Sequence, residues 1–140
     1  MRFLSFHVNY FRHKVTKKGR SKVIEEITEE SKENQVENAL VLFISMEKTD
    51  EASPEIIKRG INEIEKITKQ LKILNIVIIP FAHLFGHLSS LEFAFESFKN
   101  IESMLKLENY SVVRLPFGWF NELEMKAKGH PLSRISRIIE

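Results

Sequence analysis

The chain has 140 residues, a formal net charge of +2 at pH 7 and no cysteine. This length suits a single domain, and the missing thiols exclude a disulfide framework, a thiolate metal site and a cysteine nucleophile. The apolar runs are too short to cross a bilayer, and the N-terminus lacks a signal-peptide pattern. The composition therefore indicates a soluble globular protein with no membrane partner.

The N-terminal part of the chain predicts a hairpin followed by a loop. Arg2–Val8 has the pattern of a first strand, and Tyr10–Val15 alternates well enough to be its partner across a turn at Asn9. The basic segment Lys17–Arg20 ends this hairpin. Ser21–Asn38 is charged and poorly patterned, so we expect a loop there with no more than one helical turn.

Three continuous apolar runs predict the core strands of a sheet. They are Ala39–Ser45, Ile76–Ile79 and Ser111–Leu115, and such runs are typical of strands buried on both faces. The second run ends at Pro80 and the third at Pro116, and proline cannot donate a hydrogen bond to a sheet ladder. If these two strands run the same way in one sheet, their proline ends lie at the same edge, where open α/β sheets bind ligands.

Two further segments predict helices. Ser53 is placed to cap the first with its hydroxyl, and Pro54 suits the first helical position. Ser89 and Glu92 form a capping-box pattern at the start of the second helix. The apolar residues on the expected buried faces are Ile57, Ile61, Ile64, Leu71 and Leu74 in the first helix, and Leu91, Phe95, Phe98, Ile101 and Leu105 in the second.

The C-terminal part predicts a strand over Leu123–Lys128, a turn over Gly129–Leu132 and a short helix over Ser133–Ile139. The predicted fold class is α/β, a single domain with a mixed β-sheet and two main helices.

Few side chains carry recognisable chemistry. His83 lies three residues beyond a strand-ending proline, where it suits either a functional role or the capping of a backbone carbonyl. His83 and His87 are spaced like two metal ligands on a helix, but Gly86 between them and the missing glutamate of an H-E-x-x-H motif weaken a metal site.

Two groups of cations could contact phosphates or simply be solvated. The first group is Arg12, Lys14, Lys17, Lys18, Arg20 and Lys22, and the second is Lys126, Lys128, Arg134 and Arg137.

Three motifs together resemble the N-terminal editing domain of archaeal threonyl-tRNA synthetases. They are Pro80–Leu84, Pro116–Trp119 and Lys128–Leu132, and the resemblance extends to the opening strand and to Phe43–Lys48. It covers essentially the whole chain, residues 1–140, which we expect to be one domain excised from a longer synthetase. The family's fold is that of D-aminoacyl-tRNA deacylases, and its activity is hydrolysis of serine from mischarged tRNA(Thr). The resemblance implies a cytoplasmic enzyme, usually dimeric, with no cofactor and no metal.

The resemblance assigns a pocket with two walls that begin at Pro80 and Pro116. The catalytic positions that it implies are Ala82, His83, Phe117 and Gly118. The substrate-binding positions that it implies are Ser45, Met46 and Glu47 at the terminal adenosine, and Pro80, Phe81, Pro116, Trp119, Phe120, Asn121, His130 and Arg134 elsewhere in the site.

Three positions depart from the family pattern. Phe120 and Asn121 stand where members can carry tyrosine and lysine, and Arg134 stands where they can carry glutamate. His83 is then the one titratable group at the heart of the pocket, where it would act as a base or orient the substrate amine or a water. The mechanism we favour uses backbone amides to polarise the ester carbonyl and the 2′-hydroxyl of the terminal adenosine to position the attacking water.

The expected function is proofreading, in which L-serine is hydrolysed from Ser-tRNA(Thr) while Thr-tRNA(Thr) stays intact. A site built for threonine loses only one methyl contact when serine enters, worth about 1–3 kcal/mol, so a second site must remove the error. The expected partners are the acceptor end of tRNA(Thr), the rest of the synthetase and a second copy of the chain. A D-aminoacyl-tRNA deacylase and a non-catalytic module that binds the acceptor end stay open as alternatives, and a metal hydrolase is a more remote one.

Overall fold

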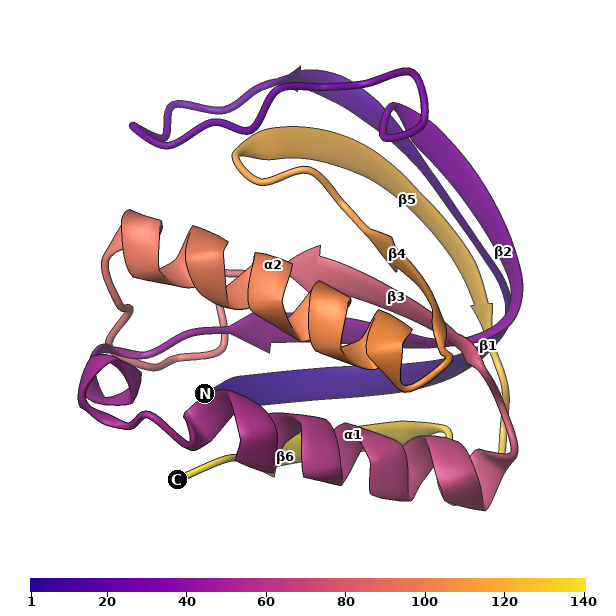
Figure 1. Cartoon of the computed structure of the whole chain (residues 1–140). Helices are drawn as coiled ribbons and strands as arrows, with labels where there is room; N and C mark the ends of the chain where they lie inside the picture. The colour runs from indigo at the N-terminus through magenta and orange to yellow at the C-terminus, as the bar shows by residue number, and fades with distance from the viewer.

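Six strands form one curved mixed sheet, and two helices cover one of its faces (Figure 1). The computed structural model describes residues 1–140. In chain order the elements are β1 (Arg2–Lys18), β2 (Glu33–Ser45), the 3-10 turn η1 (Lys48–Ala52), α1 (Ile56–Leu71), β3 (Asn75–Pro80), α2 (Leu91–Leu107), β4 (Ser111–Arg114), β5 (Trp119–Ala127) and β6 (Arg134–Ile138). The predicted α/β class, with a mixed sheet and two main helices in one domain, is confirmed. Neither helix has the length and apolarity that a bilayer span requires.

The order of strands explains why two proline-ended strands meet. The sheet runs β4-β3-β2-β1-β5, and β6 pairs with the first part of β1. β2, β3 and β4 are parallel, whereas β1 is antiparallel to β2, β5 and β6. Because β3 and β4 are parallel neighbours, Pro80 at the end of β3 and Pro116 just beyond β4 lie at the same edge, as the sequence predicts.

Apolar side chains bury the central strands on both faces. On the helix side, Ile76 and Ile78 of β3 belong to one cluster with Ile64 of α1 and with Ile101 and Leu105 of α2. The opposite face carries a smaller cluster, made of Val8, Phe11, Ala39, Val41, Val77, Ile79 and Leu115. This two-sided burial explains why β3 and the second half of β2 are apolar at consecutive positions instead of alternating.

The predicted N-terminal hairpin is wrong, and so is part of the predicted loop. β1 runs through Asn9 without a turn, because it pairs with β2 along Arg2–Lys14 and with β5 along Val8–Lys18. β2 begins at Glu33, inside the predicted loop, rather than at Ala39. Polar and charged side chains alternate between exposed and half-buried positions in the first part of β2, so no apolar run marks it. Pairing with the distant partner strand decides the structure there.

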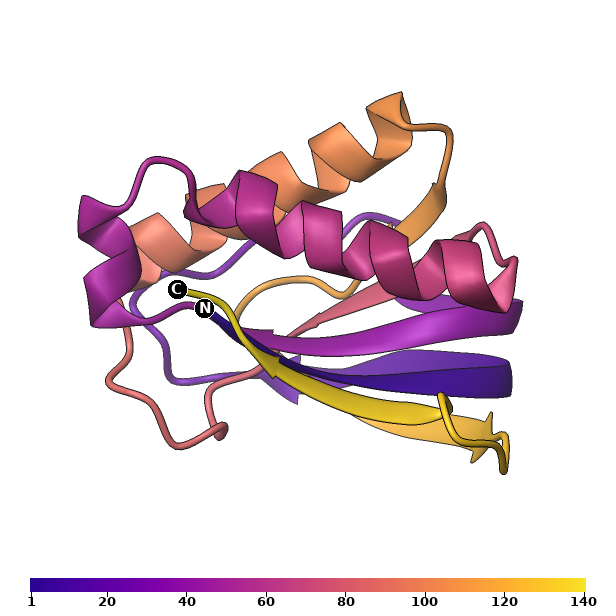
Figure 2. The ribbon, with the colours of Figure 1, turned by 90° about the horizontal axis from the view of Figure 1, so that it is seen from below.

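The C-terminal helix predicted over Ser133–Ile139 is also wrong, because most of these residues form β6. This strand pairs with the first residues of β1, with Arg134 opposite Phe6. The two ends of the chain lie side by side in consequence (Figure 2), and the Ile139 amide donates to the Met1 carbonyl at 2.8 Å.

Both helices begin slightly later than the predicted caps. α1 starts beyond Ser53 and Pro54, and no side chain caps it. In α2 the cap is Ser90 instead of Ser89, and the Ser90 hydroxyl accepts a backbone hydrogen bond at 3.3 Å. Two of the leucines predicted on the buried stripes are exposed, Leu74 by 64% and Leu91 by 38%.

A chain of hydrogen bonds fixes the turn between β5 and β6 against β1. The Leu132 amide donates to His130 Nδ1 at 3.2 Å, so the ring proton of His130 lies on Nε2. Nε2 donates to His7 Nδ1 at 2.9 Å, and His7 Nε2 donates to Asn38 Oδ1 at 2.9 Å. Every donor has an acceptor only while both imidazoles are neutral. Burial lowers the pKa of His7 below its ordinary value; the bond to Asn38 opposes this shift, and the charge of Lys128 adds to it.

A largely buried ion pair fixes the segment before β2 against the end of β4. Arg114 Nη1 and Nη2 donate to the two carboxylate oxygens of Glu25, each at 2.7 Å, and Arg114 Nε donates to Glu102 at 3.1 Å. The Phe117 amide donates to the same Glu25 carboxylate at 2.9 Å, and Trp119 Nε1 donates to the Glu25 carbonyl at 2.7 Å. Burial alone would raise the pKa of Glu25, but the bonds from Arg114 and Phe117 outweigh it and lower the pKa. Glu25 therefore holds the loop that follows β4.

Replacing Glu25 with glutamine should lower the free energy of unfolding by about 2–3 kcal/mol, because the buried Arg114 guanidinium would keep only Glu102 as an anionic partner. Urea unfolding followed by circular dichroism measures the change. Glu26→Gln is the matched control, since Glu26 is the exposed neighbouring carboxylate, and it should stay within about 0.5 kcal/mol of the wild type. Equal stabilities for the two variants would contradict the role assigned to Glu25.

Acidification should loosen the turn between β5 and β6. Because the folded-state pKa of His7 is depressed, its neutral form contributes stability that is fully present above the ordinary value of 6.5. That contribution declines as the pH falls from 6.5 through the folded-state pKa. The free energy of unfolding, measured in urea at about pH 7.5 and about pH 5.5, should fall less in His7→Gln than in the wild type, since glutamine cannot be protonated in this range. Identical falls in the two proteins would exclude His7 as the titrating group.

Candidate active site

A cavity of about 440 Å³ opens at the edge of the sheet where β3 and β4 end. Its lining comes from Met46 after β2, from Pro80–His83 after β3, from Leu115–Asn121 between β4 and β5, and from the first half of α2. Most of these side chains are apolar. The structure thus brings the two Pro–Phe segments together at the carboxyl edge of the parallel strands, where the sequence predicts a pocket.

The first wall of the cavity, Pro80–His83, continues directly from β3. The Phe81 amide donates to the Ile44 carbonyl of β2 at 2.9 Å, which fixes the point at which this wall leaves the sheet. The Phe81 ring lies edge-to-face with Phe43, at 5.3 Å between ring centroids, and with His83, at 5.4 Å. The residues that follow Phe81 are exposed at the cavity.

The second wall, Pro116–Trp119, depends on a glycine. Gly118 has a φ of +86°, and a Cβ atom there would lie 2.8 Å from both Ile24 Cδ1 and the Val23 carbonyl oxygen. Its carbonyl accepts a hydrogen bond from the Gly19 amide at 2.8 Å. The second wall is therefore wedged against residues 19–24, and no larger residue fits at Gly118.

Among the wall residues outside the strands, Ala82, His83 and Gly118 have a backbone N–H group without a protein acceptor. The Phe117 amide is different, because it already donates to the Glu25 carboxylate. Unpaired amides beside an apolar cavity can stabilise negative charge that develops on a carbonyl oxygen. Both walls thus offer backbone donors, and the donor of the second wall is Gly118 rather than Phe117.

His83 is the only residue with an ionisable side chain among those that line the cavity. Its ring is exposed and makes no hydrogen bond to the protein, so its position depends on the edge-to-face contact with Phe81. A general base is ordinarily held in one tautomer and orientation by a further group. His83 has no such group.

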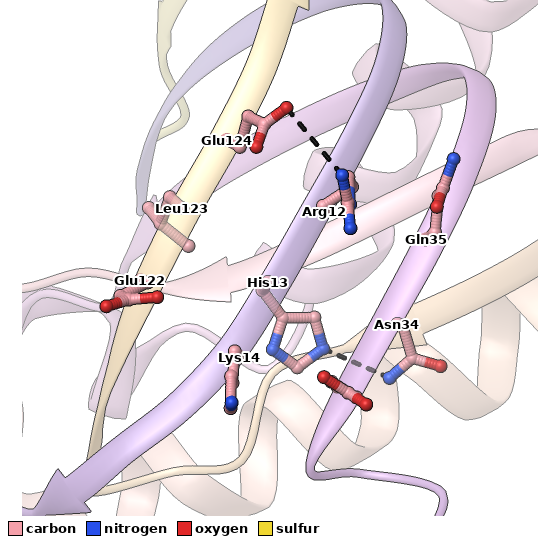
Figure 3. A pocket seen from close by; sticks show the side chains of 9 residues that line it. Arg12, His13, Lys14, Asn34, Gln35, Glu122, Leu123 and Glu124 are labelled. Carbon is pink, nitrogen blue, oxygen red and sulfur yellow. Dashed lines mark hydrogen bonds and ion pairs between the residues drawn. The ribbon is translucent and has the colours of Figure 1, made fainter.

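Asn121 lines the cavity and is held from behind by a buried histidine. Asn34 Nδ2 donates to His13 Nε2 at 3.0 Å, as Figure 3 shows, so His13 Nδ1 carries the ring proton and donates to Asn121 Oδ1 at 2.9 Å. Burial lowers the pKa of His13, although the bond to Asn121 opposes the shift. With its carbonyl oxygen occupied, Asn121 keeps its NH₂ group as the donor, and one N–H contacts the Trp119 carbonyl at 3.3 Å.

The larger cavity that Figure 3 shows is a different kind of surface. It has a volume of about 630 Å³ and is lined mainly by charged and polar side chains of β1, β2 and β5. Arg12 and Glu124 face one another across it at 4.0 Å. Its cations and carboxylates compensate one another, and it holds none of the predicted site residues.

Four predicted site residues do not line the cavity. Ser45 is buried beside Met46 with an unpartnered hydroxyl, and Glu47 forms ion pairs with Arg2 and the N-terminal ammonium. His130 lies in the turn between β5 and β6, bonded to His7, and Arg134 is exposed at the start of β6. Within one chain, the structure therefore gathers the two walls, Met46, Phe120 and Asn121, but leaves His130 and Arg134 apart from them.

His83 and His87 do not share a helix, because both lie in the loop between β3 and α2. No three histidine, aspartate or glutamate side chains of the chain gather as metal ligands would. The i,i+4 spacing of these histidines therefore does not place their side chains on one face of a helix.

Sequence reasoning missed Glu25, Arg114 and His13, which position the site from outside the cavity. Glu25 and Arg114 are 89 residues apart, and His13 and Asn121 are 108 apart, so no local motif links them. One signal was available: Arg114 interrupts an otherwise apolar core strand. A cation buried at such a position needs an anionic partner.

A solved structure resembles this fold over its whole length. The c-Myc DNA Unwinding Element Binding Protein matches with a TM-score of 0.65 over 99% of this chain and 98% of that chain, at 13% sequence identity. At this identity the likeness concerns the fold alone, and the predicted D-aminoacyl-tRNA deacylase-like fold class is confirmed.

Sequence comparison is more specific. The chain is 43% identical to a threonine–tRNA ligase of Methanosphaera stadtmanae, 42% identical to that of Methanocaldococcus jannaschii and 41% identical to that of Thermococcus sibiricus. Each match covers 99% of this chain but 22% of the relative, so the chain spans about a fifth of the length of these curated relatives. The family model for the archaea-specific editing domain of threonyl-tRNA synthetase matches residues 1–139. The chain therefore belongs to the family of archaea-specific editing domains of threonyl-tRNA synthetase.

Proposed function

We propose that this domain proofreads threonylation by hydrolysing L-serine from mischarged Ser-tRNA(Thr) and leaving Thr-tRNA(Thr) intact. The observation that carries the proposal is the apolar cavity between two Pro–Phe walls, in which Ala82, His83 and Gly118 present unpaired amides. These amides would polarise the ester carbonyl and stabilise the oxyanion that forms when water attacks. The 2′-hydroxyl of the terminal adenosine would position that water.

The lack of titratable side chains supports a mechanism based on backbone and substrate. Among the residues at the cavity, only His83 has an ionisable side chain, and no hydrogen bond from the protein fixes the orientation of its ring. An aminoacyl ester is already activated, so preorganised donors remove a large part of a modest barrier. In this mechanism His83 orients the substrate amine or a water and is not the required base.

Selection of serine over threonine would be steric. Ala82 is exposed at the cavity. Its wall is fixed by the ring of Pro80 and by the hydrogen bond of the Phe81 amide, so the Ala82 methyl group cannot easily move away from a bound substrate. A rigid small residue at that place admits a hydroxymethyl side chain and excludes one more methyl group. The synthetic site, in contrast, rejects serine only by a lost methyl contact.

A non-catalytic module that binds the acceptor end is the second candidate. Asn121 favours it, because a carboxamide held by His13 occupies a position where family members can carry lysine. The remaining partners belong to the proposal as well. They are the other domains of a threonyl-tRNA synthetase and a second copy of this chain in a homodimer.

The decisive measurement is deacylation of Ser-tRNA(Thr) beside Thr-tRNA(Thr) in EDTA. We expect rapid loss of serine only, and His83→Ala should retain activity within about tenfold, since loss of a true general base typically costs about 10²–10⁴-fold. A loss greater than about a hundredfold in His83→Ala would instead assign proton transfer to His83. If the wild type binds tRNA(Thr) but cleaves neither ester, that result would identify the binding module instead.

Substitutions at Ala82 should change the choice of amino acid. Ala82→Val should lower hydrolysis of Ser-tRNA(Thr) by at least about tenfold, because its added methyl groups fill the space for serine. Ala82→Gly should raise hydrolysis of Thr-tRNA(Thr), because it removes the methyl group that excludes threonine. Both variants keep the backbone amide. Unchanged rates on both esters would show that Ala82 is not part of the steric wall.

A further inference from the structure

Four cations within six residues lie beside the second wall of the cavity: Lys17, Lys18, Arg20 and Lys22. All four side chains are exposed. The segment has no acidic residue between Arg12 and Glu25, and Glu25 is committed to Arg114. We call these four residues the rim cations. Their position makes a concentrated positive charge at one side of the site.

The rim cations differ from the lysines of α1 and α2 in having no carboxylate partner. Lysines on α1 and α2 mostly pair with a glutamate three or four residues away, as Lys66, Lys69, Lys99 and Lys106 do. No ion pair involves a rim cation. Their charge is therefore available to an outside anion.

Backbone contacts tie this segment to the cavity. The Gly19 amide donates to the Gly118 carbonyl at 2.8 Å, and a Cβ atom on Gly19 would lie 2.5 Å from that oxygen. Lys18 lies opposite Trp119 in the β1–β5 ladder. Ser21, between two of the rim cations, lines the cavity itself.

An aromatic side chain completes this rim. Phe120 is 55% exposed, and the ammonium of Lys17 lies 5.6 Å from the centroid of its ring. A cation above an exposed aromatic ring at a cavity mouth is the combination that single-stranded nucleic acid binds, with phosphates on the cations and bases on the ring.

We propose that the rim cations bind the backbone phosphates of the single-stranded 3′ end of the tRNA, just before the terminal adenosine. This inference rests on the proposed function, because an aminoacyl ester in the cavity requires the preceding nucleotides to leave across its rim. The segment from Lys17 to Lys22 supplies cations without the opposing carboxylates found on the helices. Phe120 supplies a surface on which a base can stack.

The test compares two esters that differ in phosphate content. Ser-tRNA(Thr) carries the phosphates of the 3′ end, whereas seryl-adenosine has none. In the triple variant Lys18→Gln, Arg20→Gln, Lys22→Gln, kcat/KM for Ser-tRNA(Thr) at about 0.1 M salt should fall at least about tenfold relative to kcat/KM for seryl-adenosine. The plot of log kcat/KM against log salt should become shallower by about 2, since each phosphate contact on a single strand contributes about 0.7.

The control variant removes the same number of positive charges from the C-terminal half of α1 and its cap, which contribute no residue to the cavity: Lys66→Gln, Lys69→Gln, Lys72→Gln. It should keep the wild-type ratio of the two rates and the wild-type salt slope. An equal loss in the control, a loss on both esters alike in the rim variant, or an unchanged salt slope would overturn the proposal.

Failure of the proposed function gives a separate result. If the wild type cleaves neither ester, the rim variant and the wild type are compared in binding of uncharged tRNA(Thr). A Kd raised at least about tenfold in the rim variant alone would still support the phosphate surface, and an unchanged Kd would overturn it.

Discussion

The site depends on the ion pair between Glu25 and Arg114. Arg114 lies in a core strand with its side chain 8% exposed, and a guanidinium can stay there only with carboxylate partners. The same Glu25 carboxylate accepts the Phe117 amide, and the Glu25 carbonyl accepts the Trp119 indole. One residue thus joins the segment before β2, the end of β4 and the loop of the second wall. By occupying the Phe117 amide, it also leaves Gly118 as the free donor of that loop.

The two walls are therefore positioned by different physics. The first wall continues a parallel strand, so the backbone hydrogen bonds between β2 and β3 fix its position. The second is held by charge and by close backbone contact at Gly19 and Gly118. Donors that belong to the backbone do not change when side chains do. In the proposed mechanism, Phe120 and Asn121 would therefore not need to supply a proton donor or acceptor, provided that the backbone path is kept.

The sequence predicts the parts of the fold that are set by runs of apolar residues and by prolines. Local pattern is enough to predict the two helices and the two strands that end near Pro80 and Pro116. It also predicts that these two strand ends meet at one edge of the sheet. The three motifs point to the family. Local pattern fails where pairing at long range decides the outcome. Nothing in Tyr10–Val15 distinguishes a hairpin arm from the continuation of β1, and Ser133–Ile139 is polar enough at intervals to suit a helix or a strand. The contacts of Glu25 and His13 are invisible for the same reason.

β1 pairs with three other strands, and one of these, β6, is the last strand in the sequence. Its first residues pair with β6, close to the end of the chain, while its later residues pair with β5. A protein synthesised from its N-terminus makes β1 first, and β2 can cover one edge soon afterwards. The other edge must wait for about a hundred more residues, which at 5–20 residues per second takes on the order of ten seconds. The nascent domain thus exposes an unpaired strand edge next to Phe3 for a period set by the speed of translation, and its fold can close only after β6 has left the ribosome.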